Sequence, residues 1–220
     1  MKILGITGGV GSGKSRVLYD INKICKAYII EADKLAHELM EPGQIIYNKI
    51  VDTFGKDILC EDEPYYINRA KLGEIVFNEK NKLMQLNNIT HPGVKDYIKS
   101  MINSIKAKGS YDLFVIEAAL LIQDGYKEIC DEIWYVYVSD EERIKRLMES
   151  RNYTREKCIS IINSQESVEY YKNNTDNIIY NDGSYEETFN IITELLNKFI
   201  SNDESSIQNI SKEDFYYILK

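Results

Sequence analysis

Short apolar runs alternate with longer stretches in which apolar and polar residues are mixed. The first run, residues 2–7, ends at a pair of glycines, and similar runs occupy 28–30, 113–116, 133–138 and 178–180. Apolar runs without polar alternation are typical of parallel strands whose two faces are both covered by helices. We therefore expect each of these runs to be a buried strand.

The stretches between these runs have the apolar spacing of helices. After Ser15, for example, Val17, Leu18, Ile21 and Ile24 recur at helical intervals. Further helices are expected at 34–41, 44–54, 69–78, 80–107 and 185–200, and the polar stretch 140–172 is also helical in pattern. The proline of His91-Pro92 predicts a bend in the longest of them. Strands separated by helices imply an α/β fold with a parallel sheet.

The last twenty residues differ from the rest. A polar linker at 201–206 leads to Ser211 and Asp214, which form the start of a capping box and predict one short helix. We expect residues 1–200 to be a single domain and 201–220 to be a tail. A subunit contact is one role open to this tail, and the chain is expected to be a monomer or a weak oligomer.

Composition and charge narrow the class of protein. Hydrophobic residues make up 44% of the 220, enough for one buried core. The net charge is −8, from 27 basic and 35 acidic residues, which argues against a broad contact with nucleic acid or an anionic membrane. There is no apolar run of membrane-spanning length, no signal-peptide pattern at the start, and no Cys-x-x-Cys pair among the four cysteines. We expect a cytoplasmic protein with reduced thiols.

One motif carries specific chemistry. The sequence after the first strand matches G-x-x-x-x-G-K-[ST], and its members are Gly8, Gly9, Val10, Gly11, Ser12, Gly13, Lys14 and Ser15. Glycines let successive backbone N–H groups turn inward toward phosphate oxygens, and the following helix adds partial positive charge. Lys14 can reach the β- and γ-phosphates, and the Ser15 hydroxyl can ligate Mg²⁺. The motif predicts a site for a nucleoside triphosphate.

The rest of the chain favours a small-molecule kinase among the proteins that carry this loop. The guanine-reading sequence Asn-Lys-x-Asp of GTPases is absent, and only Glu117 offers a carboxylate at the end of the third apolar run. Four of the six arginines fall between 140 and 172, namely Arg143, Arg146, Arg151 and Arg155. This distribution is typical of a lid that closes over a transferring phosphoryl group.

Asp33 is the candidate for the acceptor side of the reaction. It follows the second predicted strand, on the edge of the sheet where the phosphate-binding loop also lies. Its carboxylate can therefore accept the proton of an acceptor hydroxyl or orient that hydroxyl. From position alone, an N-cap for the helix beginning at Lys34 is an equally good interpretation.

Many short motifs over residues 1–200 resemble the dephospho-coenzyme A kinase family. Besides the glycine-rich loop they are Glu31-Ala32-Asp33 with Ala36-His37, Glu41-Pro42-Gly43, Phe54-Gly55, Asn68-Arg69 with Leu72 and Phe77, His91-Pro92, Leu120-Leu121, Arg146, Arg151 with Thr154 and Glu156, Gln165, and Asn181-Asp182-Gly183. The resemblance implies transfer of the γ-phosphoryl group of ATP to the ribose 3′-hydroxyl of dephospho-coenzyme A with Mg²⁺. It also implies a core of five parallel strands, a helical acceptor-binding insertion at about 34–107 and a lid at about 140–172.

The resemblance also assigns roles to individual residues. Asp33 corresponds to the family's proposed base, and Lys14 and Ser15 correspond to its phosphate and metal groups. Arg146, counted with Lys14 and Asp33 among the catalytic groups, and Arg151 correspond to lid contacts with the nucleotide. The residues that fall in the acceptor-binding region are Arg69, His91 and Leu120. A solvated charge at Arg69 and a capping role for His91 at the helix bend are the alternatives.

The chain departs from the family pattern at several positions. These are Arg16, Ala119 and Gln123, and no arginine follows shortly after Gln165. Two other functions therefore stay open. One is a kinase for another small acceptor, such as a nucleoside monophosphate or a sugar acid. The other is a nucleotide-binding relative that has lost catalysis.

Overall fold

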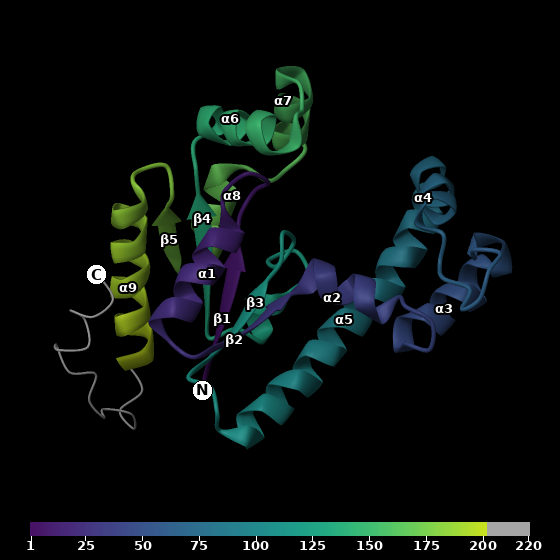
Figure 1. Ribbon diagram of the computed structural model, residues 1–220, viewed down its shortest axis with the longest axis horizontal. Coiled ribbons are helices and arrows are strands. Elements are labelled where there is room, and N and C mark those ends of the chain that lie inside the picture. Colours follow the sequence, from purple (N-terminus) through teal and green to yellow (C-terminus); the bar gives the residue numbers. More distant parts are fainter. Residues whose placement is uncertain (202–220) are drawn as a thin grey trace.

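Five parallel strands form the centre of the molecule in the computed structural model, which describes residues 1–201 (Figure 1). The strands are β1 (Lys2–Thr7), β2 (Ala27–Glu31), β3 (Leu113–Glu117), β4 (Glu132–Tyr137) and β5 (Asn177–Tyr180). Their order across the sheet is β2-β3-β1-β4-β5, and every pair is parallel. The α/β fold with five parallel strands that the sequence and the resemblance predict is confirmed.

The helices lie within a few residues of their predicted positions. Their bounds are α1 (Lys14–Ile24), α2 (Ala32–Leu39), α3 (Ile45–Phe54), α4 (Arg69–Asn78), α5 (Lys80–Lys108), α6 (Asp140–Arg151), α7 (Arg155–Asn163), α8 (Val168–Asn174) and α9 (Tyr185–Ser201), with short 3₁₀ turns at η1 (Lys56–Ile58) and η2 (Tyr126–Glu128). None of the helices within residues 1–201 has the length and apolar character needed to cross a membrane. The helix predicted from Ser211 and Asp214 lies outside the described residues.

The central strands are buried on both faces, which explains why their sequences lack polar alternation. In β3, Leu113 and Val115 pack on one side with α1 and α9, while Phe114 and Ile116 pack on the other side with α2 and α5. All four side chains have no exposed surface. Successive strand residues point to opposite faces, so both sets must be apolar in a sheet covered by helices on both sides.

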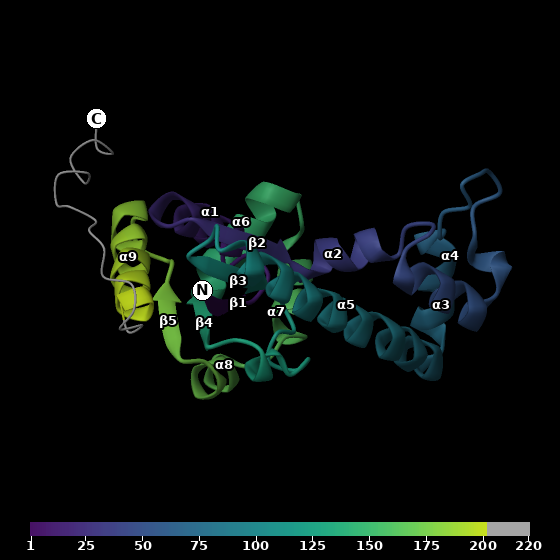
Figure 2. The same cartoon turned by 90° about the horizontal axis from the view of Figure 1, so that it is seen from below.

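Two helical parts project from this core. Helices α2 to α5 form an arm that carries α3 and α4 far from the sheet, while the C-terminal part of α5 returns to it (Figures 1 and 2). Helices α6 and α7 stand beyond the carboxyl ends of the strands and pack on each other through Ile144, Leu147, Cys158 and Ile162 (Figure 1). The carboxyl edge of the sheet therefore lies between the arm and the α6–α7 pair.

Candidate active site

The glycine-rich loop connects β1 to α1 at this carboxyl edge. Gly11 and Gly13 have φ angles of 81° and 86°, a left-handed conformation that side chains other than glycine rarely adopt. A Cβ atom at Gly13 would also collide with the side-chain amide of Asn181. Because Gly13 is the N-cap of α1, the free N–H groups of the first helical turn follow it directly. The loop and the helix end together form an anion-binding site.

Lys14 is held over this loop by two contacts. Its Nζ donates to the Gly8 carbonyl oxygen at 2.9 Å and lies 3.4 Å from Oε1 of Glu117. Glu117 ends β3 and is only 8% exposed, and burial raises the pKa of its carboxyl group while Lys14 opposes that rise. The sequence pattern alone identifies Glu117 only as a carboxylate at the end of a predicted strand. Its place in the site follows from the sheet order, because β3 is a direct neighbour of β1.

The surroundings of Ser15 fit a magnesium ion bound together with phosphates. Ser15 is exposed in the first turn of α1 and lines a hollow of about 320 Å³ with Glu31 and Lys34. Mg²⁺ prefers oxygen ligands and in kinases is usually held by one or two protein groups plus substrate phosphates. Over residues 1–201 no three His, Cys, Asp or Glu side chains gather as a ready-made metal site. The hydroxyl of Ser15 matches this sparse kind of coordination, while the Glu31 carboxylate in the same hollow is paired with Lys34 at 2.7 Å.

Asp33 lies in the first turn of α2, and the N-cap of that helix is Glu31. The interpretation of Asp33 as an N-cap is therefore wrong, because the helix begins two residues earlier than predicted. Glu31 and Glu117 are register partners in β2 and β3, so the start of α2 lies beside the end of β3. The pKa of Glu117 is raised chiefly by burial and to a smaller degree by the charge of Asp33. The exposed carboxylate of Asp33 thus faces the same edge of the sheet as Lys14.

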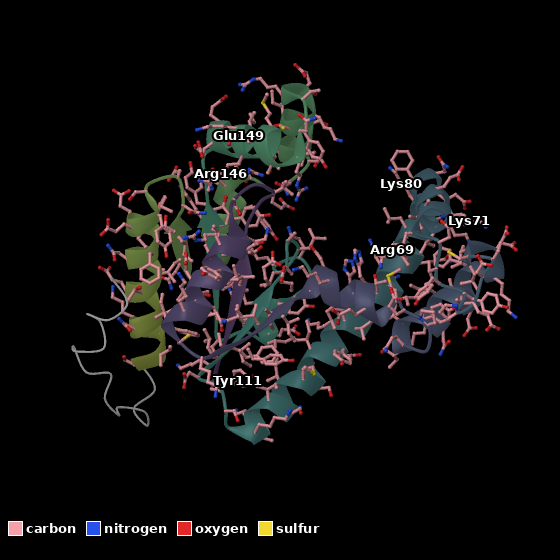
Figure 3. The ribbon with its side chains drawn as sticks, viewed as in Figure 1. Arg69, Lys71, Lys80, Tyr111, Arg146 and Glu149 are labelled. Carbon is pink, nitrogen blue, oxygen red and sulfur yellow. The ribbon has the colours of Figure 1, made fainter. Side chains whose placement is uncertain are left out.

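Arg146 connects α6 to the far end of the loop. Its side chain lies beside the loop below α6 (Figure 3). Its Nη2 donates to the Asn181 carbonyl oxygen at 2.7 Å, and its Nε donates to Glu142 at 3.0 Å. Asn181 in turn donates from Nδ2 to the Ser12 carbonyl oxygen at 2.8 Å. The turn that the sequence marks at Asn181 is therefore part of the site. Arg151, at the end of α6, is exposed and makes no side-chain hydrogen bond or ion pair with the described residues.

The other two arginines of this region have different environments. Arg143 is buried against the loop, and its Nε donates to the Val10 carbonyl oxygen at 2.9 Å. Arg155 lies on the outer surface, where it pairs with the exposed Glu141 at 2.8 Å. Sequence reasoning grouped both as lid arginines. The contact between Arg143 and Val10 spans 133 positions, so no local pattern could have separated them.

Among the residues expected at the acceptor, His91 and Leu120 lie closest to the end of β3. The Nδ1 of His91 donates to Asp124 at 2.7 Å, and this hydrogen bond raises the pKa of His91, with a smaller contribution from Asp33. The partner of His91 is thus a side chain rather than a helix carbonyl. Leu120, in the loop after β3, is 48% exposed.

Arg69 lies farther out, where α4 meets α2 in the arm (Figure 3). Its Nη1 is 3.2 Å from Nδ1 of His37, and its Nη2 is 3.8 Å from the Glu41 carboxylate. The guanidinium is half exposed, so it is neither an isolated solvated charge nor a buried structural one.

Arg16, one of the departures from the family pattern, points away from the phosphate loop. Its Nε donates to Asp20 at 3.2 Å, and its guanidinium lies 4.1 Å from the centre of the Tyr185 ring. The cation–π interaction with Tyr185 joins α1 to α9, while the ion pair with Asp20 lies within α1. An arginine at position 16 is therefore compatible with the geometry of the phosphate loop.

Comparison with known proteins agrees with this geometry. A family model described as Dephospho-CoA kinase matches residues 2–187. A dephospho-CoA kinase from Carboxydothermus hydrogenoformans is 41% identical over 199 residues, covering 90% of this chain and 95% of that protein. The structure of dephospho-CoA kinase from Campylobacter jejuni has a TM-score of 0.66 at 26% identity, covering 92% of this chain and all of the other. A Thermus thermophilus structure has a TM-score of 0.72 at 23% identity over 90% and 97% of the two chains.

Proposed function

The chain belongs to the dephospho-CoA kinase family, and on that premise we propose how its residues carry out the reaction. The protein is a kinase that uses ATP to phosphorylate dephospho-CoA in coenzyme A biosynthesis. In our proposal the acceptor atom is the ribose 3′-hydroxyl, and the carboxyl edge of the sheet is where the two substrates meet.

On the ATP side, the glycine-rich loop and the start of α1 bind the triphosphate. Lys14 is the cation of this site, and its contact with Glu117 keeps Nζ above the loop rather than in solvent. Charge shifts toward the bridging and terminal oxygens as the γ-phosphoryl group leaves, and a fixed ammonium there stabilises the transition state more than the ground state. Arg146 and Arg151 of α6 are proposed as the lid contacts to the nucleotide.

Mg²⁺ is proposed as the metal, with the Ser15 hydroxyl as its protein ligand. Held by Ser15, Mg²⁺ would neutralise part of the charge of the ATP phosphates. The exposed position of Ser15, one residue after Lys14, supports this assignment.

On the acceptor side, Asp33 accepts the proton of the attacking hydroxyl or orients it toward the γ-phosphorus. Because Asp33 lies in the first turn of α2, its carboxylate is at the junction between the arm and the sheet. His91 and Leu120 are proposed to contact the acceptor near this point, and Arg69 to contact it farther along the arm. The ion pair of Arg69 with Glu41 is long, at 3.8 Å, which leaves its donors available to an anionic acceptor.

The observation that carries the proposal is the alignment of Lys14, Glu117 and Asp33 on one edge of the sheet, contributed by α1, β3 and α2. The test is an assay of the purified chain with ATP, Mg²⁺ and separate acceptors: dephospho-CoA, a nucleoside monophosphate and a sugar acid. We expect turnover of dephospho-CoA alone, with coenzyme A and ADP formed in equal amounts. Turnover of another acceptor without turnover of dephospho-CoA would refute the assignment, and nucleotide binding without any turnover would favour a non-catalytic relative.

A further inference from the structure

We propose that Arg143 is a positioning residue for the phosphate-binding loop, holding Gly9 and Val10 in the conformation that receives the phosphates of ATP. The inference rests on the proposed function, since it takes ATP as the nucleotide. This role differs from the lid role that the sequence predicts for Arg143. In our proposal Arg143 acts by holding the loop, and it does not close over the phosphoryl group.

The hydrogen bonds of Arg143 and Gln165 hold both backbone polar groups of one loop residue, Val10. Its Nε donates to the Val10 carbonyl oxygen at 2.9 Å, and its Nη2 donates to Oε1 of Gln165. The same Gln165 oxygen accepts the Val10 N–H at 3.1 Å. Both polar groups of Val10 are thereby fixed by side chains from α6 and from the loop after α7.

Arg143 packs closely against two glycines of the loop. A Cβ atom at Gly9 would collide with the guanidinium of Arg143, and one at Gly11 would lie 3.2 Å from the Arg143 carbonyl oxygen. Helix α6 therefore presses directly against the loop along two of its glycines. A planar guanidinium with several fixed donors suits this task, whereas a single ammonium cannot hold two acceptors in one plane.

The charge of Arg143 is poorly balanced by protein groups. Its side chain is 8% exposed, and its one carboxylate partner among the described residues, Asp140 at 3.1 Å, is 61% exposed and therefore well solvated. The charge of Arg143 also acts on Tyr135 and Tyr171, whose rings are stacked, and opposes the rise in their pKa that burial causes. Burial raises the pKa of Tyr135 to about 12, so this phenol is neutral and provides no counter-charge. A buried cation with one solvated partner favours binding of a further anion beside the loop.

The test compares Arg143→Gln with Arg155→Gln, which removes an arginine of the same region whose exposed ion pair lies away from the loop. Titration calorimetry would give the affinities of each variant for ATP and for dephospho-CoA. We expect Arg143→Gln to weaken ATP binding about tenfold or more, since hydrogen bonds made by a charged group are lost. Its affinity for dephospho-CoA, and both affinities of Arg155→Gln, should stay within about twofold of the parent.

Two further variants keep the test decisive. Arg143→Lys retains the positive charge but lacks the planar set of donors of the guanidinium. Its ATP affinity should therefore lie between those of Arg143→Gln and the parent. Gln165→Ala removes the acceptor shared by Val10 and Arg143 without emptying the buried site, and should weaken ATP binding about threefold or more even if Arg143→Gln fails to fold.

An unchanged ATP affinity in Arg143→Gln, or in Gln165→Ala, would overturn the proposal. So would an equal loss of affinity for ATP and for dephospho-CoA, because a general loss of structure would produce that result. The measurement does not depend on turnover, so a parent protein that binds ATP and fails to phosphorylate dephospho-CoA would refute the proposed function while still testing Arg143.

Discussion

Replacement of Asp33 by asparagine is expected to lower kcat by a factor of about 10² to 10⁴, the range for loss of a general base. Asparagine has nearly the same size and can still accept a hydrogen bond, but it cannot take the proton of the acceptor hydroxyl. Asp33 lies in the first turn of α2 rather than on the glycine-rich loop, so ATP affinity should stay within about twofold. Steady-state rates with saturating ATP and dephospho-CoA, together with ATP titration, measure both quantities.

Glu38→Gln is the matched control for Asp33→Asn. Glu38 is another exposed carboxylate of α2, on the same short helix and outside the described contacts of the site. Its replacement should leave kcat within about twofold of the parent. If Asp33→Asn had a kcat similar to that of the parent, Asp33 would not be a catalytic residue. If Asp33→Asn and Glu38→Gln lost kcat equally, the effect would come from the negative charge of α2 as a whole and not from Asp33.

Replacement of Lys14 by methionine is expected to lower kcat/KM for ATP by a factor of about 10³ or more. Two physical effects contribute. The phosphates lose the ammonium above the loop, and Glu117 is left buried at the end of β3 without its cation at 3.4 Å. The pKa of Glu117 is already raised by burial, and removal of Lys14 should raise it further. Initial rates over a range of ATP concentrations measure the loss.

Two companion variants separate charge, geometry and folding at Lys14. Lys14→Arg keeps the charge beside Glu117 but changes the reach of the side chain, so it should preserve stability while losing most activity. Lys23→Met removes a lysine at the exposed end of the same helix α1 and should leave kcat/KM within about twofold. Activity of Lys14→Met near that of the parent would contradict the phosphate-binding role of the loop.

The layout of the fold follows from local patterns in the sequence. The apolar run 113–116 predicts β3 because both faces of that strand are buried, and the structure places Leu113 and Phe114 on opposite faces. At α2 the sequence pattern predicts a start at Lys34, whereas the helix begins at Ala32. That shift of two residues moved Asp33 from the N-cap to the first turn. A boundary error of this size is ordinary for a sequence pattern, yet here it decided between two interpretations of one residue.

The parts of the site that are close in sequence were also predictable. The glycine spacing identified Lys14 and Ser15, because the loop is a single continuous segment that imposes its own backbone geometry. Glu117 and Asn181 were not assigned to the site, and Arg143 was grouped with the lid rather than with the loop. All three reach the loop across long stretches of chain, from β3, from the end of β5 and from α6. No periodicity encodes such contacts. They become visible only when the strand order and the position of α6 are known.

Positive side chains are concentrated at the glycine-rich loop although the chain as a whole is acidic. The net charge is −8, yet both substrates of the reaction are polyanions. The structure places Lys14, Arg143 and Arg146 around the glycine-rich loop, next to the N-terminus of α1. The net negative charge is therefore compatible with anion binding, because these positive groups are gathered at the loop where we propose that the phosphates bind.

The most direct test of this account is an experimental structure of the protein with ADP, Mg²⁺ and dephospho-CoA. We expect the β-phosphate of ADP on the glycine-rich loop under Lys14, and the ribose 3′-hydroxyl of the acceptor within hydrogen-bond distance of the Asp33 carboxylate, in line with the position of the transferred phosphoryl group. An acceptor bound with a different hydroxyl toward the loop, or with its ribose away from Asp33, would contradict the assignment of the carboxyl edge of the sheet as the place of phosphoryl transfer.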